Sequence, residues 1–131
     1  MADTDRKKQI LIVEDTADLA GFIKLAIEEI GMDAHHSSDA AHAMAFLEDN
    51  RPDLIILDIG LPGVSGWELL ETINERRQLE KIFVVVTTAF QDPANRLIGK
   101  LQDVDGYLSK PFRFKELKDI VMGLLHPEES E

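Results

Sequence analysis

The chain alternates between two hydrophobic patterns. Continuous apolar runs occur at 10–13, 54–57 and 82–86, and such runs are typical of strands that are buried on both faces. Elsewhere, apolar residues recur at intervals of three and four, which is typical of helices with one buried face. An alternation of this kind predicts a parallel β-sheet with helices on both of its faces.

Two weaker segments extend the predicted sheet. The polar segment at 33–37 suits an edge strand, and Tyr107 and Leu108 mark a short last strand. The helices are predicted to bury apolar residues that recur at helical spacing: Leu19, Phe22, Ile23, Ala26, Ile27, Ile30, Met44, Leu47, Trp67, Leu70, Ile73, Leu97, Ile98, Leu101, Phe114, Leu117, Val121 and Leu124. The sequence therefore predicts a series of strands that are each followed by a helix.

Local signals mark where several of these helices begin. Asp39 precedes the second helix and is a favourable N-cap residue. Ser65 and Glu68 have the spacing of a capping box at the start of the third helix. Asp92 followed by Pro93 predicts the start of the fourth helix.

Length and composition agree with a single domain. The chain has 131 residues, of which 44% are hydrophobic, and this suits one globular domain. We assign residues 9–125 to the domain and regard 1–8 and 126–131 as polar tails, the second of them acidic. Cysteine is absent, so disulfides and thiolate metal sites are excluded.

Charge and hydropathy narrow the possible functions. The chain carries 14 Lys and Arg against 25 Asp and Glu, for a net charge of −11, which disfavours direct nucleic-acid binding. The apolar runs are too short for membrane insertion, and no secretory signal is visible. We therefore expect a cytoplasmic protein.

Polar side chains follow the apolar runs. The carboxyl ends of parallel strands lie at the same edge of a sheet, and ligands of open α/β sheets bind there. We therefore expect the polar residues at the strand ends to lie close together. These residues are Glu14, Asp15, Asp58, Thr87, Thr88 and Lys110.

The predicted cluster has the chemistry of a phosphoryl-transfer site. Two unit charges ~4 Å apart repel each other by about 4 kcal/mol at an effective dielectric constant near 20, so clustered carboxylates require a proton or a cation. Oxygen ligands without His or Cys suit Mg²⁺. Lys110 and a threonine hydroxyl can bind phosphoryl oxygens, and a carboxylate beside the metal can act as the nucleophile.

Four motifs of the chain resemble those of response-regulator receiver domains. The motifs are ILIVED at 10–15, LIILDIGLPG at 54–63, TA at 88–89 and YLSKPF at 107–112. The resemblance covers residues 9–125. It implies a flavodoxin-like α/β fold, in which a doubly wound five-stranded parallel sheet of order 2-1-3-4-5 has helices on both faces.

The resemblance also implies roles for the acidic residues. Asp58 is the expected phosphoacceptor. Mg²⁺ is the expected cofactor, held by Glu14, Asp15 and Asp58 and by the backbone carbonyl of Gly60.

On the same resemblance, Lys110 pairs with the phosphoryl oxygens, and its peptide bond to Pro111 is expected to be cis. Thr88 binds the phosphoryl group once Asp58 is modified, and Tyr107 is a switch residue that moves with Thr88. Strand alternation should point Thr87 to the other face.

The function that follows is signalling in a two-component system. The expected partners are a histidine kinase or a histidine phosphotransfer protein, which supplies the phosphoryl group, and a downstream target protein. The domain would catalyse only its own phosphorylation and dephosphorylation, as a monomer or a weak dimer. A stand-alone regulator of the chemotaxis type is expected, and a receiver excised from a larger regulator or hybrid kinase is the alternative.

Two other functions and one departure from the family pattern qualify this prediction. A flavin-binding electron carrier has the same topology, but the Glu14–Asp15 acids would repel a flavin phosphate. An aspartyl-phosphate hydrolase would carry a second acid where this chain has Gly60. Receiver domains often have Gly-Ala before the last strand, whereas this chain has Asp103-Val104-Asp105.

Overall fold

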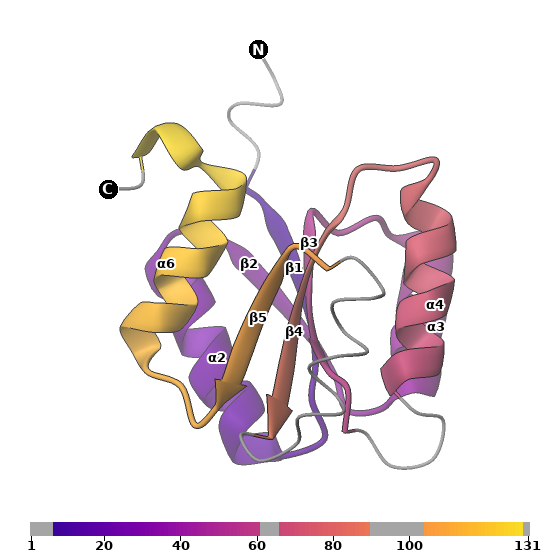
Figure 1. Cartoon of the computed structure of the whole chain (residues 1–131), viewed down its shortest axis with the longest axis horizontal. Helices are drawn as coiled ribbons and strands as arrows, with labels where there is room; N and C mark the ends of the chain where they lie inside the picture. The colour runs from indigo at the N-terminus through magenta and orange to yellow at the C-terminus, as the bar shows by residue number, and fades with distance from the viewer. Residues whose placement is uncertain (1–6, 61–65, 90–103, 130–131) are drawn as a thin grey trace.

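A five-stranded parallel sheet forms the centre of the molecule (Figure 1). The computed structural model describes residues 7–60, 66–89 and 104–129. The sheet has the order β2-β1-β3-β4-β5, which confirms the predicted fold class. Its strands are β1 (Gln9–Val13), β2 (Asp33–Ser37), β3 (Leu54–Asp58), β4 (Phe83–Ala89) and β5 (Gly106–Lys110).

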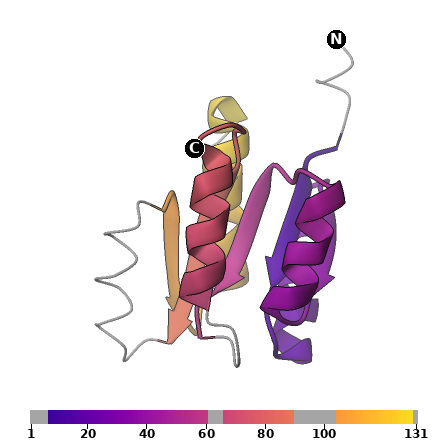
Figure 2. The same cartoon turned by 90° about the vertical axis from the view of Figure 1, so that its right-hand side faces the viewer.

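Helices cover both faces of the sheet (Figures 1 and 2). Helices α2 (Ala17–Glu29) and α6 (Phe114–Leu125) lie on one face, and α3 (Ala40–Asp49) and α4 (Gly66–Arg77) lie on the other. A short 3₁₀ helix, η1 (Pro127–Glu129), follows α6. None of the helices in the described residues is long and apolar enough to cross a membrane.

The core consists of two layers, one on each face of the sheet. Successive residues of a strand point to opposite faces, so each buried strand contributes to both layers. The layer under α2 and α6 includes Ile10, Ile12, Leu54, Ile56, Val85 and Leu108. The layer under α3 and α4 includes Leu11, Val13, Ile55, Leu57, Val84 and Val86. This alternation also fixes the face on which each residue at a strand end lies.

The helix predictions are confirmed in part. The Asp39 side chain caps α3 by accepting a hydrogen bond of 2.8 Å from the His42 N–H. Leu47 is buried, but the prediction that Met44 is buried is wrong, because its exposure is 40%. The buried side of α3 is formed by alanines and Leu47, and Met44 lies beside this stripe.

Two helix signals lie outside the described residues. These are Ser65 of the predicted capping box and the predicted helix that starts at Asp92 and Pro93. The domain limits at 9 and 125 stay a prediction.

Gly66 provides a test of how tightly α4 packs on the end of β3. A Cβ atom at Gly66 would overlap Ile59 Cα and lie 2.8 Å from the Asp58 carbonyl oxygen, whereas one at Gly21 would have nothing within 4 Å. We expect Gly66→Ala to lower the free energy of unfolding by about 2–3 kcal/mol through overpacking. Gly21→Ala, in the exposed part of α2, should raise it by about 0.5–1 kcal/mol. Denaturant unfolding of both variants measures the two effects, and equal effects would contradict the predicted contact.

Candidate functional site

The acidic residues predicted from the strand ends lie together. Glu14 and Asp15 follow β1, and Asp58 is the last residue of β3. These two strands are hydrogen-bonded neighbours in the sheet. One carboxylate oxygen from each of the three residues lies within 4.8 Å of the others. The structure thus forms an acidic cluster at the carboxyl edge of the sheet, toward which the arrowheads point in Figure 1.

Lys110, the last residue of β5, reaches into this cluster. Its Nζ atom lies 3.1 Å from Glu14 Oε1 and 3.1 Å from Asp58 Oδ2. The peptide bond that joins it to Pro111 is cis, as expected. Since Glu14 and Asp58 are both buried, two buried carboxylates share one ammonium group.

Backbone N–H groups bind the second oxygen of each buried carboxylate. Glu14 Oε2 accepts a hydrogen bond of 3.1 Å from the Thr16 N–H. Asp58 Oδ1 accepts one of 2.8 Å from the Gly60 N–H. These bonds hold the Glu14 and Asp58 carboxylates in fixed orientations at the rim of the sheet.

Burial and the neighbouring charges shift the pKa values of Glu14 and Lys110. Burial raises the pKa of Glu14, and the Asp58 carboxylate raises it further, while the Thr16 N–H and Lys110 lower it without cancelling the increase. Burial lowers the pKa of Lys110, but Asp58 and Glu14 outweigh burial, so the pKa of Lys110 is raised. Lys110 therefore stays charged, and the excess of negative charge stays with the carboxylates.

The donor set fits a hard divalent cation. The three converging side chains offer only carboxylate oxygens, which are the ligands that Mg²⁺ prefers in proteins. Asp15 is exposed, so the cluster is open to solvent on the side of this residue. A cation there would offset the negative charge that Lys110 leaves uncompensated.

Two threonines lie near the carboxyl end of the neighbouring strand β4, just before its last residue, Ala89. Thr87 and Thr88 each have an exposure of 1%, and neither hydroxyl has a hydrogen-bond partner among the residues that the structure describes. Strand alternation points them to opposite faces. Thr88 points to the same face as Val86, two residues earlier in β4. Val86 and its register partner Tyr107 belong to the layer under α3 and α4, so Thr88 lies on that face.

Sequence reasoning missed a histidine contact at the site. His36 is exposed, and its Nε2 atom lies 2.7 Å from the backbone carbonyl oxygen of Glu14. The Glu14 N–H also donates to the Ser37 carbonyl at 3.1 Å. Strand β2 thereby holds the segment that carries the Glu14 carboxylate. The only sequence signal was the position of the histidine in a strand adjacent to β1.

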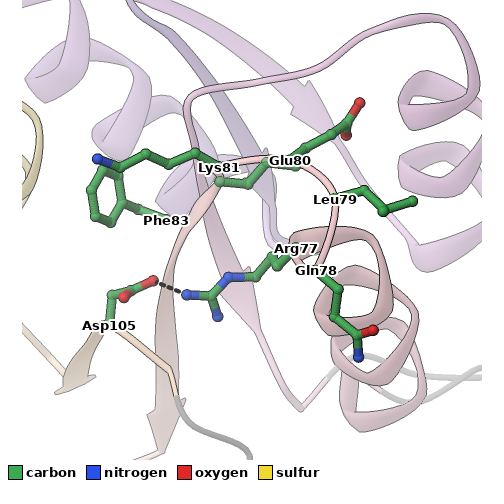
Figure 3. Close-up of a pocket in the computed structure, with 8 residues that line it drawn as sticks. Arg77, Gln78, Leu79, Glu80, Lys81, Phe83 and Asp105 are labelled. Carbon is green, nitrogen blue, oxygen red and sulfur yellow. Dashed lines mark hydrogen bonds and ion pairs between the residues drawn. The ribbon is translucent and has the colours of Figure 1, made fainter.

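The departure from the family pattern before β5 lies partly outside the described residues, but its last residue, Asp105, has defined partners. Asp105 Oδ2 accepts hydrogen bonds of 2.7 Å from Arg77 Nη2 and 2.8 Å from the Val84 N–H. Figure 3 shows this ion pair in a pocket of about 430 Å³ that also includes Leu79 and Lys81. The pocket lies at the amino ends of β4 and β5, the edge of the sheet opposite the acidic cluster. It therefore does not belong to the site.

The chain is similar to proteins of one family. Residues 10–122 match the family model of the response regulator receiver domain. The phosphate regulon transcriptional regulatory protein PhoB of Pseudomonas aeruginosa is 36% identical over 110 residues, which are 84% of this chain and 48% of PhoB. The DNA-binding response regulator MtrA of Mycobacterium bovis is 32% identical over 129 residues, which are 98% of this chain and 55% of MtrA. The chain thus spans about half the length of these curated relatives.

A solved structure has the same fold. The crystal structure of a CheY-like response regulator receiver domain protein from Methanospirillum hungatei superposes with a TM-score of 0.82 at 25% sequence identity. The match covers 95% of this chain and 98% of that one. The sequence and structure comparisons therefore both match this chain to response regulator receiver domains.

The shared ammonium makes a prediction about Glu14→Gln. Because the pKa of Glu14 is raised, folding favours the protonated form of this residue when no metal is bound. The stability that this protonated form contributes is fully present below the unfolded-state pKa and is lost as the pH rises through the folded-state pKa. We expect Glu14→Gln to raise the free energy of unfolding near pH 7 by about 1 kcal/mol, or roughly 4 °C in Tm. The difference from wild type should vanish below about pH 4.

Added Mg²⁺ should make wild type more stable than Glu14→Gln, because an ion that binds the three carboxylates stabilises wild type more than the variant that lacks one of them. Thermal unfolding at several pH values, with and without Mg²⁺, measures both effects. Glu28→Gln on the exposed side of α2 is the control and should change neither. A Glu14→Gln variant that is less stable than wild type without metal at pH 7 would contradict the prediction.

Proposed function

The chain belongs to the response regulator receiver domain family, and on that basis we propose that Asp58 accepts a phosphoryl group whose presence switches a protein-binding surface. The main support is the buried Asp58 carboxylate, which shares Lys110 with Glu14 at the carboxyl edge of the sheet. The family match agrees with the receiver prediction and not with the flavin-carrier alternative.

Glu14, Asp15 and Asp58 would hold Mg²⁺ in this function, and the backbone carbonyl of Gly60 is the proposed further ligand. When bound, the ion would offset the negative charge that carboxylates and phosphoryl oxygens bring together. Lys110 supplies a second positive charge, because its Nζ atom already contacts Asp58 Oδ2.

The proposed reaction is a displacement at phosphorus. One carboxylate oxygen of Asp58 forms a bond to the phosphorus atom of a phosphohistidine, while the nitrogen–phosphorus bond breaks and its electron pair returns to the imidazole. Lys110 leaves the carboxylate and pairs with the phosphoryl oxygens. Water later attacks the phosphorus, the oxygen–phosphorus bond to Asp58 breaks, and inorganic phosphate and the free carboxylate result. The domain acts as a catalyst only on itself.

Thr88 would convert this chemistry into a conformational change. Its buried hydroxyl has no partner among the described residues, so a phosphoryl oxygen that accepts a hydrogen bond from it removes an unfavourable state. Movement of Thr88 would alter the packing of Tyr107, because both residues lie on the same face of the adjacent strands β4 and β5, where Tyr107 is the register partner of Val86 and Thr88 that of Ser109. Phosphorylation then shifts an equilibrium between two conformations.

The proposed phosphoryl donor is a histidine kinase or a histidine phosphotransfer protein. The relatives PhoB and MtrA are transcriptional and DNA-binding regulators by name. For this chain we propose a protein as the downstream target, since a net charge of −11 opposes contact with DNA. The proposed recognition surface is formed by α6 and by β5, the strand that carries Tyr107 and Lys110.

Acetyl phosphate with Mg²⁺ tests the proposed acceptor. We expect wild type to gain one phosphoryl group, detected by intact-protein mass spectrometry, and Asp58→Asn to gain none. EDTA should suppress the adduct, because the carboxylates alone repel the phosphoryl donor. Asp119→Asn in α6, whose side chain is 64% exposed, is the matched control and should be phosphorylated like wild type. An adduct that persists in Asp58→Asn would assign the acceptor to another residue.

Replacement of Lys110 tests the proposed switch. We expect Lys110→Ala to reduce the conformational response to phosphorylation at least severalfold, because the ammonium no longer connects β5 to Asp58. The only tryptophan, Trp67, lies in α4 next to Gly66 and packs on the layer under α3 and α4, so its fluorescence reports the change. Lys115→Ala, an exposed surface lysine, should respond like wild type. A full response in Lys110→Ala would exclude this role.

A further inference from the structure

Thr87 lies on the same side of the sheet as the phosphoacceptor. It is the register partner of Asp58 across β3 and β4 and of Leu108 across β4 and β5. Register partners in a parallel sheet present their side chains to the same face, and adjacent strands lie ~4.8 Å apart. The Thr87 side chain is therefore next to that of Asp58, whereas Thr88 points to the other face.

Packing does not explain a hydroxyl at this position. Thr87 has an exposure of 1%, and its Oγ1 atom has no hydrogen-bond partner among the residues that the structure describes. An unpaired buried hydroxyl is unfavourable by ~1–3 kcal/mol. Valine, which occupies the three preceding positions of β4, has the same shape without this cost. The orphaned hydroxyl therefore indicates a partner in another state of the site.

Both carboxylate oxygens of the neighbouring Asp58 are already engaged in the unphosphorylated protein. Asp58 Oδ1 accepts from the Gly60 N–H at 2.8 Å, and Asp58 Oδ2 accepts from Lys110 Nζ at 3.1 Å. In the proposed function, phosphorylation makes one carboxyl oxygen the bridging oxygen of an acyl phosphate and moves Lys110 to the phosphoryl group. The carboxyl group of Asp58 then no longer accepts a hydrogen bond from the charged Lys110 side chain.

We infer that Thr87 is a second hydroxyl donor of the site, which hydrogen-bonds the carboxyl group of Asp58 when Asp58 is phosphorylated. This inference rests on the proposed function. Thr87 is the register partner of Asp58, and Thr88 is one residue further toward the carboxyl edge, where the phosphoryl oxygens would lie in the proposed function. The two adjacent hydroxyls thus serve different oxygens. Thr87 forms no covalent bond and acts as a positioning residue that stabilises the phosphorylated state.

Thr87→Val and Thr87→Ser separate the hydroxyl from the shape of the side chain. With acetyl phosphate and Mg²⁺, we expect Thr87→Val to lower the steady-state ratio of phosphorylated to unphosphorylated protein about fivefold, the equivalent of about 1 kcal/mol for one hydrogen bond. Thr87→Ser should stay within about twofold of wild type. Unphosphorylated Thr87→Val should unfold at the same or a higher denaturant concentration than wild type, because it loses an unpaired hydroxyl.

Each outcome distinguishes the inference from the proposed function. Thr72→Val, which removes an exposed hydroxyl in α4, is the matched control and should keep the wild-type ratio. A wild-type protein that gains no phosphoryl group overturns the proposed function. A labelled wild type with an unchanged ratio in Thr87→Val overturns only the inference, as does an equal loss in Thr87→Val and Thr87→Ser. Lower stability of unphosphorylated Thr87→Val also overturns it, since the hydroxyl would then be bonded before phosphorylation.

Discussion

The sharing of one ammonium group by two buried carboxylates is the interaction on which the site depends. Lys110 Nζ contacts Glu14 and Asp58 at the same distance of 3.1 Å, and both acids are almost fully buried. A buried charge pair gains from such contacts only when most of the charge is compensated. Here one negative charge remains in excess, and the exposed Asp15 adds another. The folded protein thus holds a local charge imbalance that a cation can relieve.

The sheet makes this arrangement possible. The buried strands β1 and β3 end at the same edge and are direct neighbours, so residues that are far apart in sequence arrive within a few ångströms of one another. The two core layers hold each strand from both faces, which prevents the strand ends from moving apart to reduce repulsion. Hydrophobic burial along the strands, at about 25 cal/mol per Å², thereby offsets the electrostatic cost at their ends.

The sequence predicted features that depend on the local pattern of residues. It did not predict features that depend on contacts between segments far apart in the chain. Apolar runs predicted the buried strands, and the residues that follow them predicted the acidic cluster. The exposure of Met44 could not be predicted, because small alanines elsewhere on α3 form the buried side. The contact of His36 with Glu14 depends on the register of an edge strand. The bonds of Asp105 to Arg77 and to β4 join segments that only the fold brings together.

The unpaired hydroxyls near the end of β4 indicate which kind of group would relieve the charge imbalance. A cation alone could relieve the repulsion of the carboxylates, but it would leave Thr87 and Thr88 without partners. A group that brings new acceptor oxygens relieves both unfavourable features at once, and a phosphoryl group on Asp58 is such a group. The site is therefore complementary to a modified aspartate rather than to the free one. In the proposed function, that difference would allow a small covalent change to shift the equilibrium of the domain.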